Sequence, residues 1–282
     1  MPPMRLRWVT IVLMGVGLLA ACSSPQPTPT ATTAPTPTPT LSAATPVPTG
    51  RVRVEYIPPT DLLYAELSED AKTLGLLEEL AEPLNRSIVW PKDLTLSTGE
   101  CGVANAFYDP AERRITMCWE LLEQALGLLT PLATTEDELA QWAAGAYAFF
   151  FYHELGHALI DLLDLPTVGR EEDAVDQVAA LTLLDPEAGQ DGLVAIDAAI
   201  GFFFVMGSQA EGLQDLAFWD VHSLDLQRAY GMACLAYGYD PTFFAEYVGE
   251  FGFLPAERAQ GCEKEYTRTS EAWERLLQPH RP

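Results

Sequence analysis

A change in composition near residue 50 limits which part of this chain can fold. Residues 23–50 hold eight prolines, nine threonines and no charged residue. Such a segment cannot bury enough apolar surface to form a core, and its prolines favour an extended polyproline II conformation. At about 3.1 Å per residue it would reach roughly 85 Å. We therefore expect one folded domain at residues 51–282, and we interpret residues 22–50 as a tether.

The residues before the tether are typical of a secretory signal. Arg5 and Arg7 give a basic start, and a short apolar stretch follows. The end of that stretch, Leu19-Ala20-Ala21-Cys22, resembles the bacterial lipobox, in which the cysteine is acylated and becomes the new N-terminus. We predict a lipoprotein signal peptide at residues 1–21 and a lipid on Cys22, which would anchor the protein to a bacterial membrane outside the cytoplasm. An ordinary secretory signal with an incidental cysteine is the alternative.

The other cysteines are consistent with export, since an even number in an exported chain favours disulfides. They are Cys101, Cys118, Cys234 and Cys262. Two short strand patterns, 103–108 and 114–119, flank a proline-containing turn and place Cys101 nearly opposite Cys118. We therefore predict the pairs Cys101–Cys118 and Cys234–Cys262, with free buried thiols as the alternative.

The charge of the chain excludes one class of partner. Forty acidic residues outnumber 16 basic ones, which gives a formal net charge of −24. A protein that binds nucleic acid needs a basic face, so no nucleic-acid partner is expected. An uninterrupted apolar run of about 18 residues is also absent from the sequence, so no ordinary membrane-spanning helix is expected.

Helical patterns dominate the folded part, and the expected fold class is α+β, rich in helices, with a small β-hairpin or sheet beside the central helix. A first strand is expected at 51–56. The expected helices are 61–80, stopped by Pro83, then 135–164, 171–184, 193–207, 222–237, 241–251 and 265–277. Thr135 and Glu138 form a capping box at the start of the longest helix.

The strongest functional signal is His153-Glu154-Leu155-Gly156-His157, inside that longest helix. Residues four apart share a helix face, so both imidazoles can reach one metal ion. The segment fits the zincin motif HExxH, in which two histidines bind zinc and the glutamate is the general base. We predict His153 and His157 as zinc ligands and Glu154 as the base. An accidental pattern on a surface helix is the alternative.

A catalytic zinc needs a third protein ligand, and the next predicted helix offers one. Glu172 and Asp176 lie four residues apart on it. This Glu-x-x-x-Asp pattern after HExxH resembles the gluzincin peptidases, in which the glutamate binds zinc and the aspartate hydrogen-bonds a ligand histidine. The resemblance implies Glu172 as third ligand and Asp176 as support. Glu171 and Asp173 are the alternatives, since acidic residues are favoured in a first helical turn.

Three segments are similar to a bacterial family described as putative metallopeptidases, formerly a domain of unknown function. They are residues 152–177, with both motifs, 105–121 and 219–230. The resemblance covers most of residues 60–265 and implies a zincin fold with one zinc ion per chain. It also makes His222 a catalytic candidate, because zincins often add a further side chain to the oxyanion and His222 lies in the third segment. A structural hydrogen bond near a helix start is an equally good interpretation of His222.

Together these features predict a membrane-tethered, extracytoplasmic zinc peptidase, which uses a zinc-activated water with Glu154 as general base. Its partners would be a peptide or protein substrate and, through the lipid, a membrane. Zincins usually bind an extended substrate along an edge strand, and strand 103–108 is the candidate here. The main alternative is a zinc-containing binding lipoprotein without catalysis, and a third is a surface adhesion or scaffold lipoprotein. Arg228 is expected in an ion pair.

Overall fold

The computed structural model describes residues 50–249 and 252–282. The predicted signal peptide (1–21), the lipidated Cys22 and the tether up to residue 49 lie outside the described residues. The strands in the described part are β1 (Val52–Tyr56), β2 (Leu94–Gly99), β3 (Ala106–Asp109) and β4 (Arg114–Cys118). Its α-helices are α1 (Leu62–Leu74), α2 (Leu76–Ser87), α3 (Trp119–Leu129), α4 (Glu136–Leu163), α5 (Glu171–Leu183), α6 (Gly189–Gly207), α7 (Asp225–Tyr239), α8 (Ala256–Ala259) and α9 (Cys262–Leu277). The helix-rich α+β prediction is confirmed.

The strands form one sheet in the order β1-β2-β4-β3. β1, β2 and β4 are parallel, whereas β3 runs antiparallel to β4 and forms an edge. The predicted hairpin is therefore confirmed, although β3 is shorter than the expected strand. The sequence reasoning missed β2, which is almost entirely buried and pairs on both sides. A buried strand lacks the alternation of apolar and polar residues that marks an exposed one.

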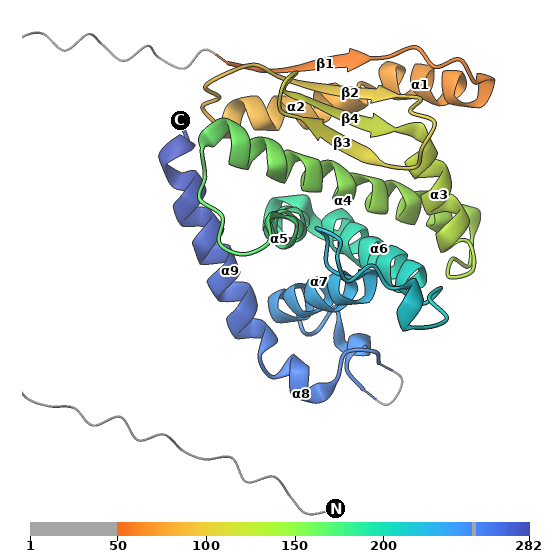
Figure 1. Ribbon diagram of the computed structural model, residues 1–282, viewed down its shortest axis with the longest axis vertical. Helices are drawn as coiled ribbons and strands as arrows, with labels where there is room; N and C mark the ends of the chain where they lie inside the picture. The colour runs from red at the N-terminus through yellow and green to blue at the C-terminus, as the bar shows by residue number, and fades with distance from the viewer. Residues whose placement is uncertain (1–49, 250–251) are drawn as a thin grey trace, which may run out of the picture. The chain divides into compact units, whose positions relative to one another are not determined.

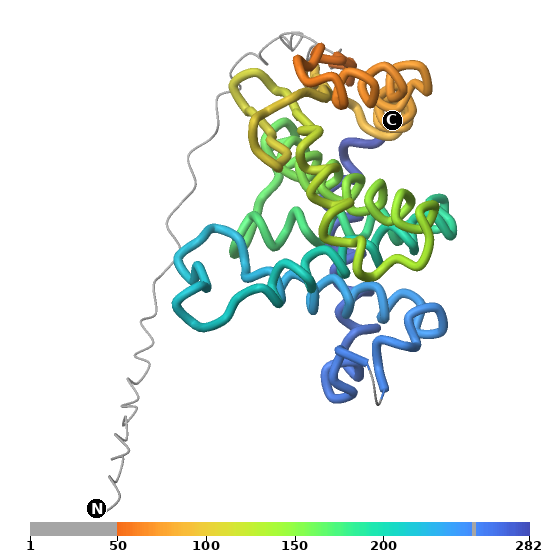
Figure 2. The backbone as a smooth tube through the Cα atoms, turned by 90° about the vertical axis from the view of Figure 1, so that its right-hand side faces the viewer, coloured from red at the N-terminus to blue at the C-terminus, as the bar shows by residue number. Residues whose placement is uncertain are grey.

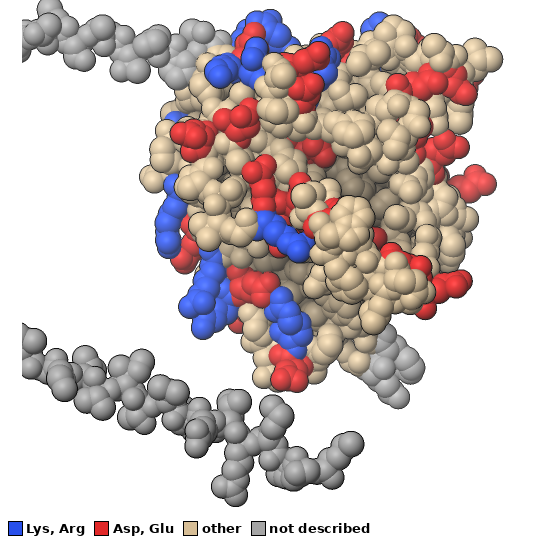
Figure 3. All heavy atoms as spheres, viewed as in Figure 1, with Lys and Arg blue, Asp and Glu red and all other residues tan. Residues whose placement is uncertain are grey.

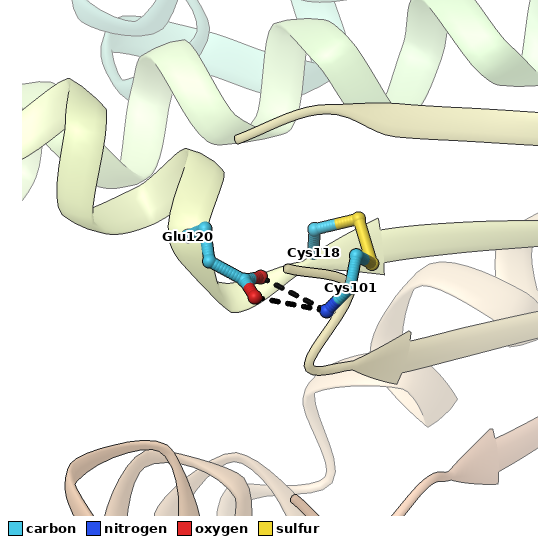
Figure 4. Close-up of side chains that lie close together, drawn as sticks. All are labelled: Cys101, Cys118 and Glu120. Carbon is cyan, nitrogen blue, oxygen red and sulfur yellow. Dashed lines mark hydrogen bonds between the residues drawn. A yellow bond between two sulfur atoms is a disulfide. The ribbon is translucent and has the colours of Figure 1, made fainter. Parts of the chain in front are cut away.

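A disulfide braces the segment that leads into β3. Cys101 and Cys118 are bonded as predicted, but Cys101 lies in the loop before β3 and not in the hairpin itself. The Glu120 carboxylate accepts a hydrogen bond from the backbone N–H of Cys101 at 2.9 Å (Figure 4). It also accepts one from the backbone N–H of Gly102 at 2.6 Å. The two sulfur atoms are thus bonded to each other, and the carboxylate is bonded to the loop backbone, so this cluster acts as a brace.

Helix α4 is the central element of the domain. Figure 1 shows the sheet on one side of α4 and helices α5, α6 and α7 on the other. The Thr135 hydroxyl caps its start by accepting from the backbone N–H of Glu138 at 3.1 Å. The other half of the predicted capping box is absent, because the Glu138 carboxylate accepts from the N–H and hydroxyl of Thr134 instead of the Thr135 N–H. Gly156 lets α5 approach closely, because a Cβ atom built there would lie 2.8 Å from Val175 Cβ. This close approach brings the start of α5 beside the histidines of α4.

Several predicted helix bounds are wrong for identifiable reasons. The expected helix 61–80 divides into α1 and α2, because Gly75 adopts a left-handed conformation with φ of 69°. Pro83 lies inside α2 and does not stop it. Helix α3 was missed. The expected helix 241–251 is reduced to a short 3-10 turn, Ala245–Tyr247, within its described residues.

The C-terminal helices close the core around α4. Cys234 in α7 and Cys262 in α9 form the second predicted disulfide. Among the described residues, the helical stretch Pro186–Gly207 is long and apolar enough, by length and composition alone, to cross a membrane. Its core-facing residues, among them Ile196 and Phe203, are buried against the rest of the domain. Its apolar character is therefore explained by the core.

Candidate metal centre

Two turns of α4 present the HExxH side chains to a cleft beside the sheet. His153 and Glu154 are buried, and His157 is partly buried. The imidazole rings of His153 and His157 lie 5.1 Å apart between centroids. The helical spacing thus places both rings on one face, as the sequence predicts.

The first turn of α5 supplies an acidic side chain opposite these rings. Glu172 Oε2 lies 3.2 Å from His153 Nε2 and 3.3 Å from His157 Nε2. A third imidazole arrives from the segment before α7, with His222 Nε2 3.0 Å from the same oxygen. Glu172 Oε2 is buried and has no hydrogen-bond partner among the described residues. Three nitrogen atoms therefore converge on one orphaned carboxylate oxygen.

This donor set fits a zinc ion. His153, His157 and Glu172 each offer an atom, and these atoms lie within 4.8 Å of one another. Ligands at about 2.0–2.1 Å from a tetrahedral zinc are about 3.4 Å apart, close to the 3.2 and 3.3 Å contacts found here. A buried carboxylate oxygen that accepts no hydrogen bond is costly unless a cation satisfies it. His222 does not belong to this mutually close set.

Each imidazole is oriented by a carboxylate on its other nitrogen. Nδ1–H of His153 donates to Asp176 at 2.8 Å, and Nδ1–H of His157 donates to Glu171 at 2.8 Å. Nδ1–H of His222 donates to Asp220 at 2.9 Å. A carboxylate can only accept, so in all three rings the proton is held on Nδ1 and Nε2 is directed to the common point. This is the tautomer that a metal ligand requires.

Asp176 is itself held by a buried cation. Arg228 on α7 donates two hydrogen bonds to Asp176, both 2.7 Å long, in the ion pair that the sequence led us to expect. The guanidinium also lies 4.0 Å above the Phe203 ring. Burial alone would raise the pKa of Asp176, but attraction to Arg228 and the hydrogen bond from His153 hold it at about 2. Asp176 therefore stays ionised and keeps the His153 ring in place.

Glu154 lies beside the donor set without joining it. Burial raises the pKa of its carboxyl group, while the nearby histidines and the backbone N–H of Tyr108 oppose this effect. Tyr108 belongs to β3, so the open edge of the sheet faces Glu154. A partly desolvated carboxylate with a raised pKa is suited to accept and return a proton near neutral pH.

The cleft around these groups has a volume of about 600 Å³. Its walls come from β3, α4, the first turn of α5 and His222, and its lining includes Phe107, Tyr108 and Asp161. The wall formed by His222 belongs to a segment between α6 and α7, which extends from the body of the domain (Figure 2). This space is large enough for several residues of an extended peptide.

Two side chains at the start of α5, one of them on the residue just before the helix, fix the His222 segment. Arg170, the residue before α5, donates to the backbone carbonyl of His222 at 2.9 Å. The Ser223 hydroxyl donates to Asp173 at 2.6 Å. The start of α5 thus holds His222 in place as well as supplying Glu172.

The structure brings together every metal-site residue that the sequence predicted, namely His153, Glu154, His157, Glu172, Asp176 and His222. Sequence reasoning gave Glu171 and Asp173 only as alternative ligands, whereas they bind His157 and Ser223 instead. It missed Asp220 and Arg170 entirely. A carboxylate two residues before a histidine, as in Asp220–His222, was the available signal for the first of these.

Comparison with known proteins gives one match. The model of a family described as "Putative metallopeptidase" matches residues 56–277. No curated protein and no solved structure matches the chain. The matched range begins at the last residue of β1 and includes β2, β3 and β4, the HExxH helix, α5 and the His222 segment.

Proposed function

We propose that this chain, which belongs to the putative metallopeptidase family, is a zinc-dependent peptidase that hydrolyses peptide bonds with Glu154 as general base. The family membership confirms the resemblance drawn from the sequence. The observation that carries the proposal is the convergence of His153, His157 and Glu172 beside a partly desolvated Glu154. A purely structural zinc site is usually closed by a fourth protein ligand and needs no such base.

The roles of the side chains follow from their positions. His153, His157 and Glu172 would hold the zinc ion. When bound, zinc would supply Lewis acidity, which lowers the pKa of water and stabilises negative charge. Glu154 would take a proton from the attacking water and pass it to the leaving amine.

His222 would donate from Nε2 to the oxyanion that forms on the substrate carbonyl. It reaches the site from the side opposite to the sheet, and Asp220 fixes its ring. The nearby carboxylates of Glu172 and Asp220 raise the pKa of His222, which favours the protonated, donating form. The proposal therefore assigns His222 a catalytic role in preference to a purely structural one.

The substrate would lie along β3. This strand pairs with β4 on one side only, and its other edge faces the cleft. An extended peptide can add to such an edge by backbone hydrogen bonds, which places its carbonyl groups beside Glu154. The brace formed by Cys101–Cys118 and Glu120 would keep this edge in position.

The proposal includes the location and the anchor. The signal-like segment 1–21, the lipobox at Cys22 and the uncharged Pro/Thr segment support an extracytoplasmic lipoprotein attached to a bacterial membrane. The disulfides Cys101–Cys118 and Cys234–Cys262 are consistent with an oxidising compartment. A peptide or protein substrate outside the cytoplasm follows from this location.

Metal analysis and peptide cleavage test the proposal on the full chain in detergent. We expect about one zinc per chain, lost in His157→Ala and Glu172→Ala and retained in His280→Ala, a matched histidine variant outside the site. Glu154→Gln should retain zinc and lose cleavage of a peptide library. Zinc binding without cleavage in the wild type would favour the non-catalytic binding lipoprotein, and absence of zinc would contradict both functions.

A further inference from the structure

Apart from its histidines, the cleft beside the metal centre is lined by charged side chains of one sign. Its lining carries the carboxylates Glu154, Asp161, Glu171 and Glu172, and no lysine or arginine is among the lining residues in the described part of the chain. Two of the four are committed to the histidines, since Glu172 faces all three imidazoles and Glu171 binds His157. On the face in Figure 3, basic side chains gather mostly towards the left, and acidic ones are spread over the face. A divalent ion would offset only part of the negative charge of the cleft.

Asp161 is the carboxylate best placed to meet a substrate side chain. It follows His153 and His157 at the same four-residue spacing on α4, so it lies on the same face about 6 Å beyond His157 along the helix. Its Oδ2 accepts from the Tyr108 hydroxyl at 2.6 Å, whereas its Oδ1 accepts no hydrogen bond from the residues that the structure describes. The side chain is exposed to the cleft. It is thus fixed on one oxygen and open on the other.

Tyr108 also relates Asp161 to the path of a bound peptide. Its hydroxyl contacts Asp161, and its backbone N–H faces Glu154. A peptide beside β3 therefore passes Asp161 close to the bond that Glu154 would attack. One helical turn of about 5.4 Å corresponds to one or two residues of an extended chain at about 3.3 Å each.

We infer that the substrate is a basic polypeptide segment, with lysine or arginine one or two residues from the cleaved bond, held by the free oxygen of Asp161. The inference rests on the proposed function for the position of the bond. The charge of the cleft opposes acidic segments for the same reason that it attracts basic ones. Asp161 is then the residue that determines specificity.

Binding to the zinc-loaded Glu154→Gln full chain tests the inference apart from catalysis. Fluorescent peptides of one length would carry lysine, glutamine or glutamate at each position near the centre, and anisotropy would be measured in 0.15 M NaCl to screen distant charges. We expect the lysine peptide to bind at least about tenfold more tightly than the glutamate peptide. In Asp161→Asn, the ratio of the affinities for the lysine and glutamine peptides should fall by about fivefold, as expected for the loss of an exposed ion pair.

Two control variants separate local charge from other effects. Tyr108→Phe removes the hydrogen bond but keeps the carboxylate, so it should preserve the preference for lysine. Asp70→Asn removes one exposed carboxylate on α1, outside the cleft lining, and should leave the ratio unchanged. Asp161→Lys should invert the preference, which keeps the test informative if Asp161→Asn has only a small effect.

The outcomes distinguish the two proposals. Equal binding of lysine and glutamate peptides, or the same loss in Asp70→Asn as in Asp161→Asn, would overturn the inference. Cleavage by the wild type of neutral or acidic peptides in preference to basic ones would overturn it while leaving the peptidase intact. Preferred binding of lysine peptides without any cleavage by the wild type would support the inference and refute the proposed function.

Discussion

Gly156 tests whether close packing of α4 on α5 positions the metal centre. A Cβ atom built at Gly156 would lie 2.8 Å from Val175 Cβ and Val178 Cγ1, and 2.9 Å from Val175 Cγ1. Both valines are buried and β-branched, so neither can turn away easily. Gly156→Ala should therefore push α5 outwards. Glu172 lies on the first turn of α5, so the change should reach the donor set although it adds only one methyl group.

The expected magnitude combines two opposing effects. Alanine is better than glycine in a helix by about 1 kcal/mol, and overpacking a core costs about 1–3 kcal/mol. Gly127 in α3 gives a matched control, because a Cβ there meets nothing within 4 Å. Gly127→Ala should raise the free energy of unfolding by about 1 kcal/mol. The difference between the two variants should thus be about 1–3 kcal/mol, or about 2–12 °C in melting temperature for a domain of this size.

Stability and metal affinity would be measured on the same samples. Thermal unfolding of the metal-free proteins gives the difference in stability, and competition with a chelator gives the zinc affinity. We expect Gly156→Ala to bind zinc about tenfold more weakly or worse, as for other changes that displace a metal ligand. A Gly156→Ala protein as stable as Gly127→Ala, with the zinc affinity of the wild type, would refute the packing explanation.

Three further changes act on the groups around the histidines. Arg228→Met leaves Asp176 buried without its cation, so the free energy of unfolding in urea at pH 7 should fall by about 3–5 kcal/mol. The pKa of Asp176 is about 2 in the folded protein and higher in the unfolded chain. The stability that Asp176 contributes should therefore be present above about pH 4 and disappear as the pH falls towards 2. Acid titration of the wild type would show this loss. Glu172→Gln should lower zinc affinity at least about tenfold by dialysis equilibrium, since an amide is a poor zinc ligand. Asp220→Asn should retain zinc but lower kcat about tenfold with little change in KM, because the substitution releases the His222 ring. An unchanged kcat would argue against a catalytic role for His222.

The sequence was most informative where chemistry depends on local spacing. The histidines of HExxH are one helical turn apart, and Glu172 and Asp176 are one turn apart on the next helix. These spacings depend only on local helix geometry and not on the tertiary structure, so the donor set could be predicted from two short segments. The Cys101–Cys118 pair was also accessible from local sequence, because the hairpin brings the loop before β3 close to the end of β4.

Interactions between distant segments were not predictable in this way. The buried strand β2 pairs in parallel with β1 and β4 across long connections, and no local pattern fixes such a partner. Arg170 and Asp220 became meaningful only once the segment before α7 was found against the start of α5. Acidic residues are favoured in the first turn of any helix because of the helix dipole. The presence of Glu171 there therefore gave no sign of its specific contact with His157.

In the proposed zinc site, the carboxylates that orient the histidines would also affect how the metal-free protein binds the ion. Burial alone would lower the pKa of His157, but the carboxylates of Glu172 and Glu171 raise it to about 9. At pH 7 the metal-free imidazole is therefore protonated, and zinc must displace that proton because only neutral imidazole is a ligand. For each proton that zinc displaces, the zinc affinity should rise about tenfold when the pH is raised by one unit, up to about pH 9. Calorimetric titration with zinc at pH 7, in two buffers of different ionisation enthalpy, would count the protons released on binding. We expect at least one proton per zinc ion. A heat of binding that does not depend on the buffer would show that the histidines are already neutral.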